Sequence, residues 1–243
     1  MRILVVSDIH ANIDAFEAVL SDSRQDRDAI YCLGDLVGYG PDPDACVSLA
    51  AEVCDATLAG NHDLAACRRM DMSSFSTHAR QAMEWTRSNL SSETIAFLET
   101  LPVSAEKNGI LLSHGSPADP VWGYILSCED AAEAFAALKC SICLFGHTHV
   151  PSAFVSISDD PSKIKIEYGE PGHILKTGTG SLLLNPGSVG FPRDAADAHA
   201  SDSERRAAAR YAVFDDKAET WEFKRVEYDL RSTVKRMRKA GLW

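Results

Sequence analysis

The chain has 243 residues, of which 45% are hydrophobic and 24% are charged, a composition typical of a globular protein. Its 35 acidic residues outnumber its 24 lysines and arginines, so the formal net charge is −11. This charge argues against a protein that coats duplex nucleic acid or an anionic membrane through bulk attraction. An anionic substrate is still compatible with it, because a bound metal can reverse the local field.

The sequence contains no apolar run near the roughly 20 residues of a membrane span. The N-terminal run, residues 3–6, is too short for the core of a signal peptide and is better explained as a buried strand. The seven cysteines are an odd number with scattered spacing. Cys140 and Cys143 have C-x-x-C spacing but lie in a strand pattern without a second pair, which favours small core residues over a redox or zinc site. We therefore expect a reducing, cytoplasmic location.

Short β-branched runs alternate with helical patterns along the first half of the chain, separated by Gly, Pro and Asp. The apolar runs predict strands at residues 3–7, 29–33, 56–59, 109–113 and 141–145. The periodic segments predict helices near residues 13–20, 45–51, 77–88, 93–101 and 129–138. Alternation of this kind is typical of an α/β fold.

The second half has a different pattern, in which strands are joined by turns and are expected to be antiparallel. These strands are predicted at residues 152–158, 164–168, 181–185, 211–215 and 220–226. Residues 194–210 are rich in Ala, Asp, Ser and Arg and predict a mobile excursion or a marginal helix outside the core. Leu230, Val234 and Met237 recur at helical spacing and predict a docked C-terminal helix with a solvated basic face. We find no internal repeat or linker, so residues 1–243 are interpreted as one domain with two sheets covered by helices.

Five apolar runs of the sequence end in residues that can bind metals. The blocks that follow them are Asp8-Ile9-His10, Gly34-Asp35, Gly60-Asn61-His62-Asp63, His114-Gly115 and Gly146-His147-Thr148-His149. Each block alone could be a loop cap or a structural histidine. Because sites in α/β sheets form beyond the carboxyl ends of the strands, all five could instead converge on one rim.

The chemistry of this donor set narrows the type of metal. It offers three or four imidazoles, two carboxylates and an amide oxygen without a thiolate, which suits Mn²⁺, Fe, Zn²⁺, Ni²⁺ or Co²⁺ better than Ca²⁺. Seven ligands are too many for one tetrahedral zinc site. They fit two divalent ions about 3.5–4 Å apart that share a bridging carboxylate.

These blocks resemble the signature of the calcineurin-like metallophosphoesterases in order and spacing. The later segments Asn185-Pro186-Gly187-Ser188-Val189-Gly190 and Pro192-Arg193-Asp194 resemble the small prokaryotic phosphodiesterase branch of that superfamily. The resemblance implies a four-layer α/β/β/α sandwich, with two mixed sheets flanked by helices. It also implies two divalent transition metal ions as cofactors.

The resemblance further implies a role for each matching residue. The first metal would be held by Asp8, His10 and His149, the second by Asn61, His114 and His147, with Asp35 as the bridge. His62 would act beside the metals as proton donor or transition-state stabiliser, oriented by Asp63 or a nearby carboxylate. Asn61, His62 and Arg193 would contact the substrate phosphate. Loops near Tyr39, Arg68, Trp122 and Arg193 are expected to determine the choice of substrate.

The implied reaction is hydrolysis of small phosphate esters by a hydroxide that bridges the two metals. Phosphodiesters are expected to be preferred over phosphomonoesters. The segment after Asp35 lacks the Asp/Arg pair of the Ser/Thr phosphatases and symmetrical dinucleoside-tetraphosphate hydrolases, and Asp63 stands where those proteins have Glu. The metal-binding Tyr of purple acid phosphatases would fall at Gly38. The alternatives are a catalytically silent binding module on the same fold and a nucleotide-directed phosphatase or nuclease. The sequence does not indicate an oligomeric state.

Overall fold

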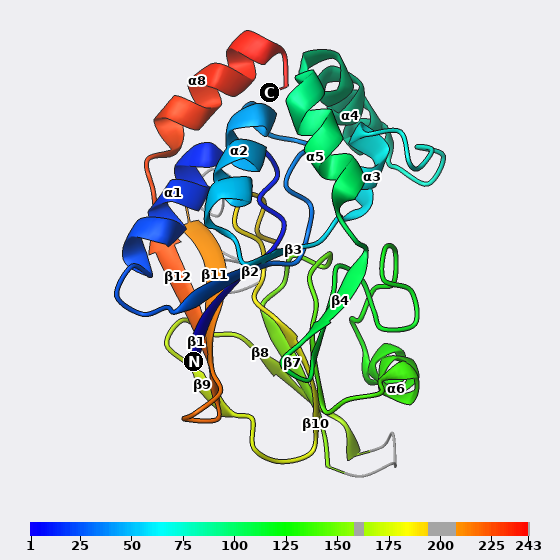
Figure 1. The fold of residues 1–243 in the computed structure, drawn as a ribbon, viewed down its shortest axis with the longest axis vertical. Coiled ribbons are helices and arrows are strands. Elements are labelled where there is room, and N and C mark those ends of the chain that lie inside the picture. The colour runs from blue at the N-terminus through cyan, green and yellow to red at the C-terminus, as the bar shows by residue number, and fades with distance from the viewer. Residues whose placement is uncertain (158–162, 194–207, 243) are drawn as a thin grey trace.

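A computed structural model describes residues 1–157, 163–193 and 208–242, and in it two mixed six-stranded sheets lie face to face (Figure 1). In spatial order, the first sheet contains β3 (Ala56–Thr57), β2 (Ala29–Cys32), β1 (Arg2–Val6), β11 (Ala208–Asp215), β12 (Thr220–Glu227) and β9 (Ile174–Lys176). The second contains β4 (Ser104–Lys107), β5 (Ile110–Ser113), β6 (Ile142–Leu144), β10 (Ser181–Asn185), β7 (Ser152–Ser156) and β8 (Lys165–Tyr168). Strands β1, β2 and β3 are parallel, as are β5, β6 and β10, whereas the other pairs are antiparallel.

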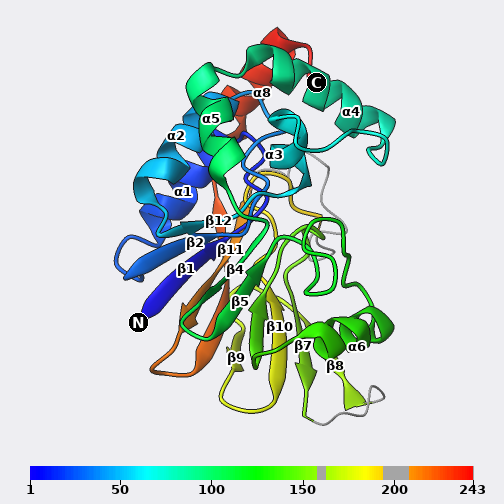
Figure 2. The same ribbon diagram turned by 45° about the vertical axis from the view of Figure 1, so that its right-hand side comes forward.

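Helices cover the outer faces of both sheets (Figure 2). They are α1 (Ile13–Asp22), α2 (Pro43–Val53), α3 (Asn61–Ala66), α4 (Thr77–Asn89), α5 (Ser92–Thr100), α6 (Cys128–Ala137) and α8 (Leu230–Ala240). Helix α1 packs against β11 and β12 and also contacts α8, while α6 packs against β7 and β10 of the second sheet. The four layers confirm the α/β/β/α sandwich and the docked C-terminal helix.

Burial on both faces of β1 explains its continuous apolar sequence. Leu4 and Val6 belong to the core between the first sheet and its helices, whereas Ile3 and Val5 belong to the core between the two sheets. Successive strand side chains point to opposite faces, so one run of four apolar residues serves two cores. A third core, which includes Phe145 and Phe154, lies between the second sheet and α6.

Side-chain caps define where several helices begin. Asn12 accepts a hydrogen bond from the backbone N–H of Ala15 at 3.2 Å and so caps α1. Ser91 does the same for α5, where it accepts from Thr94 N–H, and Ser127 for α6. Such caps satisfy backbone donors that have no partner within the helix.

The structure differs from the sequence-based expectations in a few elements. The 194–210 prediction was wrong at its C-terminal end, because residues 208–210 form the buried start of β11; residues 194–207 lie outside the described part of the chain. Strands β4 and β9 and helix α3 were not predicted. Cys140 precedes β6 instead of lying within it, and all seven cysteines are free thiols. Among the described helices, none has the length and apolar character that crossing a membrane requires.

Candidate metal centre

The seven expected ligand side chains converge beyond the carboxyl ends of the parallel strands. Asp8 and His10 follow β1, and Asp35 follows β2. The other four are Asn61 at the start of α3, His114 after β5, and His147 and His149 after β6. None of the seven is more than 5% exposed. The convergence expected at one rim of the sheets is therefore present.

Asp8, His10 and His149 form the first group of donor atoms. Their candidate ligand atoms all lie within 4.8 Å of one another. His149 Nε2 is 3.1 Å from His10 Nε2 and 3.2 Å from Asp8 Oδ1. Metal–ligand bonds of about 2.0–2.2 Å place neighbouring ligand atoms roughly 3 Å apart, so these separations match a shared cation.

Backbone carbonyl groups orient the two imidazoles of this group. The Nδ1 of His10 is 3.1 Å from the carbonyl oxygen of Val37, and that of His149 is 2.6 Å from the carbonyl oxygen of Phe191. A ring that donates its Nδ1–H to a carbonyl presents the lone pair of Nε2, the usual arrangement behind a metal-binding histidine. The buried Asp8 Oδ1 has no hydrogen-bond partner in the part of the chain that the structure describes. Buried acceptors that face one another without a donor fit a cation between them.

The second group contains His114, Asn61 and His147. His114 Nε2 lies 3.2 Å from both Asn61 Oδ1 and His147 Nδ1. Its Nδ1 is 3.0 Å from the carbonyl oxygen of Leu33, which again directs the Nε2 lone pair into the site. The His147 Nε2 is buried and has no hydrogen-bond partner among the described residues.

Asp35 lies between the two groups. Its Oδ2 is 3.7 Å from His10 Nε2 and 3.4 Å from His114 Nε2, so a single oxygen faces one imidazole of each group. Its Oδ1 accepts a hydrogen bond from the backbone N–H of His62 at 2.9 Å, which fixes the carboxylate plane. This is the position that a carboxylate shared by two cations requires.

The backbone at the centre is unusual, because five of the ligands have positive φ. The angles are 54° at Asp8, 49° at His10, 55° at Asp35, 64° at His147 and 63° at His149. This left-handed region costs a non-glycine residue roughly 1–2 kcal/mol, and such residues cluster at functional sites. A glycine is also required at residue 60, where an added Cβ would lie 2.1 Å from Asp35 Oδ1.

Burial and mutual charge set the protonation of the site. Burial lowers the pKa of His62 to about 4 and that of His147 to about 3, and it holds the pKa of His10 well below its usual value. The His10 and His147 rings are therefore neutral near pH 7 and have a lone pair to offer a cation, whereas the neutral His62 ring has one N–H to donate. Burial also disfavours the charged form of His114, but the adjacent Asp35 carboxylate outweighs this and raises the pKa of His114 to about 9.

His62 lies beside both groups and lines the open cavity above them. It is 4% exposed, and its Nδ1 is 3.2 Å from the sulfur of Met83, a contact that the sequence did not predict. The expectation that Asp63 orients this ring is not supported by the contacts. Asp63 Oδ1 accepts from Val37 N–H at 3.1 Å, and Oδ2 accepts from Gly60 N–H at 3.0 Å. Asp63 therefore positions the loops around the site instead of the imidazole.

The cavity above the centre has a volume of about 230 Å³ and opens to solvent. Its lining combines ligands with side chains from several loops: Asp35, Tyr39, Asn61, His62, Ser74, Phe75, Ser76, Ala79, Trp122, Tyr124, His147, His149 and Arg193. Tyr39, Trp122 and Arg193 thus line the cavity as expected, whereas Arg68 does not. Phe75 and Tyr124 were not singled out by the sequence, because they lie in loops without a periodic pattern.

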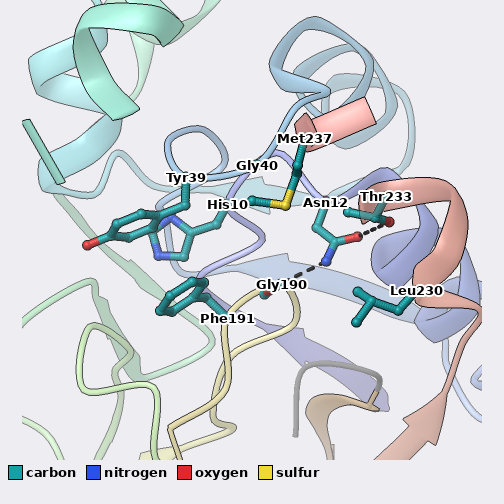
Figure 3. Close-up of a pocket in the computed structure, with 9 residues that line it drawn as sticks. All are labelled: His10, Asn12, Tyr39, Gly40, Gly190, Phe191, Leu230, Thr233 and Met237. Atoms are coloured by element: carbon teal, nitrogen blue, oxygen red, sulfur yellow. Dashed lines mark hydrogen bonds between the residues drawn. The ribbon is translucent and has the colours of Figure 1, made fainter. Parts of the chain in front are cut away.

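A second, much smaller pocket lies behind the loop after β1, between His10 and helix α8 (Figure 3). In this region Asn12 donates a hydrogen bond to the carbonyl oxygen of Gly190 at 3.3 Å and accepts one from the Thr233 hydroxyl at 3.4 Å. Arg236 of α8 forms ion pairs with Asp14 and Asp42. Helix α8 therefore supports the ligand-bearing loop after β1 from behind.

A model of the calcineurin-like phosphoesterase superfamily domain matches residues 1–203. The chain belongs to this superfamily. A metallophosphoesterase from Sphaerobacter thermophilus shares its fold with a TM-score of 0.86 and 39% identity, over 100% of this chain and 95% of that one. An uncharacterized protein of Methanocaldococcus jannaschii is 32% identical over 246 residues, which cover 99% of this chain and 93% of the relative.

Other superfamily relatives match only part of the chain. Proteins named symmetrical bis(5'-nucleosyl)-tetraphosphatase, from Acidovorax sp. and Delftia acidovorans, are 44% and 40% identical over 70 and 68 residues. Each of these matches spans only 24% of the relative's own length. Membership of the superfamily makes the chain a metal-binding hydrolase of phosphate esters, and the clusters described above are the residues that could hold the metal.

Proposed function

We propose that this protein is a dimetal-dependent phosphoesterase that hydrolyses small phosphate esters, with phosphodiesters preferred over monoesters. The observation that carries the proposal is the position of Asp35 Oδ2, which faces His10 in one donor group and His114 in the other. The preference for diesters is supported by the resemblance of residues 185–194 to the small phosphodiesterase branch. The names of the partial relatives support action on phosphate linkages.

In this proposal Asp8, His10 and His149 hold one divalent cation, Asn61, His114 and His147 hold the other, and Asp35 is shared. Bound cations of this kind lower the pKa of water from 15.7 towards about 7 and polarise phosphoryl oxygens. The protein supplies a buried set of oriented lone pairs to hold the cations.

His62 is the residue that we propose to act on the substrate directly. It lines the cavity, and one of its ring nitrogens lies within 4.8 Å of ligand atoms of Asp35 and His10. Its N–H can donate to the oxygen that leaves phosphorus and so offset the charge that develops there. Arg193, at the open side of the cavity, adds positive charge near a bound phosphate.

The test is a reconstitution experiment. Protein stripped of metal is loaded separately with Mn²⁺, Ni²⁺, Co²⁺, Fe²⁺ and Zn²⁺ and assayed with bis-p-nitrophenyl phosphate and p-nitrophenyl phosphate. We expect at least one metal to give hydrolysis that a chelator abolishes, with a higher kcat/KM for the diester. No turnover with any of the metals would contradict the proposed activity, and a higher kcat/KM for the monoester would contradict the diester preference.

A further inference from the structure

We infer that Phe75, Trp122 and Tyr124 form a subsite, the aromatic mouth, that binds a planar ring carried by the substrate. The ring would be a nucleobase or an aryl group attached to the phosphate ester. This inference rests on the proposed function and names the substrate class for the same site. All three side chains line the cavity that also contains Asp35, Asn61 and His147.

The aromatic mouth begins directly beside the metal centre. The ring centroid of Tyr124 is 4.2 Å from that of His147, and the centroid of Trp122 is 5.9 Å from it. Phe75 contacts His62 at 4.9 Å and meets Trp122 edge to face at 5.2 Å. A phosphate bound at the centre therefore places its substituent next to these rings, because ligands and aromatic residues share one cavity.

The exposure of Tyr124 indicates that the subsite has room for a partner. Its side chain is 46% exposed although it lies against a buried imidazole, whereas Phe75 is only 6% exposed. Tyr39 also lines the cavity, but one of its faces is already stacked on Phe191, with centroids 4.7 Å apart and planes at 16°. Covering an exposed aromatic face with a planar ring removes apolar surface from water and adds stacking.

The loop that carries Trp122 and Tyr124 is held in shape by its own hydrogen bonds. Asp119 Oδ1 accepts from the backbone N–H of Trp122 at 3.1 Å, and the Asp119 carbonyl oxygen accepts from Gly123 N–H at 3.0 Å. Gly123 allows the close approach, since an added Cβ would lie 2.2 Å from Ser116 Oγ. A loop wound this tightly holds the rings in place before the substrate binds, which reduces the entropy lost on binding.

The charge of the cavity restricts the class further. Among the described residues that line it, Asp35 is the sole carboxylate, and it is directed at the metal centre. Arg193 is the cationic side chain of the lining and lies over Phe191, with its guanidinium carbon 5.6 Å from the ring centroid. A substrate with a neutral ring and an anionic phosphate fits this distribution, whereas a cationic substituent would find no acidic partner at the mouth.

The test compares ligands that differ only in the ring. Dissociation constants for AMP and ribose 5-phosphate, and for phenyl phosphate and methyl phosphate, are measured by calorimetry with the Mn²⁺-loaded protein. We expect the ringed member of at least one pair to bind about five- to 150-fold more tightly, the range for one base stacked on an aromatic side chain. A preference in the first pair alone identifies a nucleoside ester, and a preference in the phenyl pair identifies an aryl ester.

Variants assign the preference to the aromatic mouth. Trp122→Ala and Tyr124→Ala should each reduce the affinity ratio towards one, and Trp122→Phe should keep most of it. Tyr168→Ala is the matched control, because Tyr168 is 63% exposed and is not among the described residues that line the cavity. Ratios near one in both ligand pairs, or ratios unchanged in both alanine variants, would overturn the inference. Calorimetry needs no turnover, so failure of the hydrolysis assay and failure of ring recognition give different results.

Discussion

Asp63→Asn is the substitution that best separates a positioning role from a catalytic one. The two carboxylate oxygens accept from Val37 N–H at 3.1 Å and from Gly60 N–H at 3.0 Å, and the side chain is fully buried. An amide has one oxygen and one NH₂ group, so one of the two backbone donors loses its acceptor and faces another donor. The carbonyl oxygen of Val37 lies 3.1 Å from His10 Nδ1, so a displacement of the Val37 backbone would move a ring that we expect to bind metal.

The magnitude follows from the lost contact. A buried donor without a partner costs about 1–3 kcal/mol. Taking about 2 kcal/mol, and roughly 2–4 °C per kcal/mol for a chain of this size, we expect the Tm to fall by roughly 4–8 °C. At a temperature where the variant is folded, kcat should fall much less than in His62→Ala.

Thermal unfolding and steady-state kinetics on the same samples check this prediction. Asp130→Asn is the matched control, because Asp130 has the same position in the first turn of α6, accepts from Ser127 N–H at 2.9 Å, and is not among the described residues that line the cavity. It should lower the Tm by less and leave kcat unchanged. If Asp63→Asn instead kept the wild-type Tm and lost as much kcat as His62→Ala, Asp63 would be an orienting group for the imidazole and our reasoning would be wrong.

Three further results are expected. His62→Ala should lower kcat by about 10²–10⁴-fold, while the amount of bound metal, measured by mass spectrometry, stays constant. His173→Ala is the control. Loss of metal from His62→Ala would show that His62 is a ligand. The pKa of His114 is raised to about 9, so below that pH a cation must displace the proton of this ring in order to bind. Titrations with Mn²⁺ should therefore show the affinity for the metal rising about tenfold per pH unit between pH 6 and 8. An affinity that does not change with pH would argue against His114 as a ligand. Arg193→Ala should raise KM about 1.4- to fivefold, since an exposed charge pair contributes about 0.2–1 kcal/mol, and an unchanged KM would remove Arg193 from the phosphate site.

The ligand set was predictable from the sequence because of where the strands end. Strands buried on both faces are continuous apolar runs, so residues such as Asp8 and Asp35 stand out directly after them. Strands β4 and β9 were missed for the opposite reason. Both are partly exposed at the edges of their sheets and have no apolar run.

The surroundings of the ligands depend on contacts between segments far apart in sequence, which no local pattern encodes. Nothing around Met83 indicates that its sulfur lies 3.2 Å from the His62 ring. Asp63 follows His62 directly, which suggested a shared role, but helix geometry turns its carboxylate to Val37 and Gly60 instead. The aromatic mouth is similar, because Phe75 and Tyr124 line one cavity only once the segment before α4 and the loop after β5 are in place.

The strained loops of the centre are held by one another. Asp8 N–H donates to the carbonyl oxygen of Gly34 at 3.0 Å, and His10 N–H donates to that of Asp35 at 2.9 Å, so the loop after β1 is paired with the loop after β2. Asp8 Oδ2 also accepts from His147 N–H at 3.1 Å, which joins the loop after β6 to the same unit. Asp8, His10 and Asp35 are therefore held by backbone hydrogen bonds between two ligand loops, and His147 is held by the Asp8 carboxylate. It follows that the ligands act as one unit, and the effects of removing them one at a time need not add.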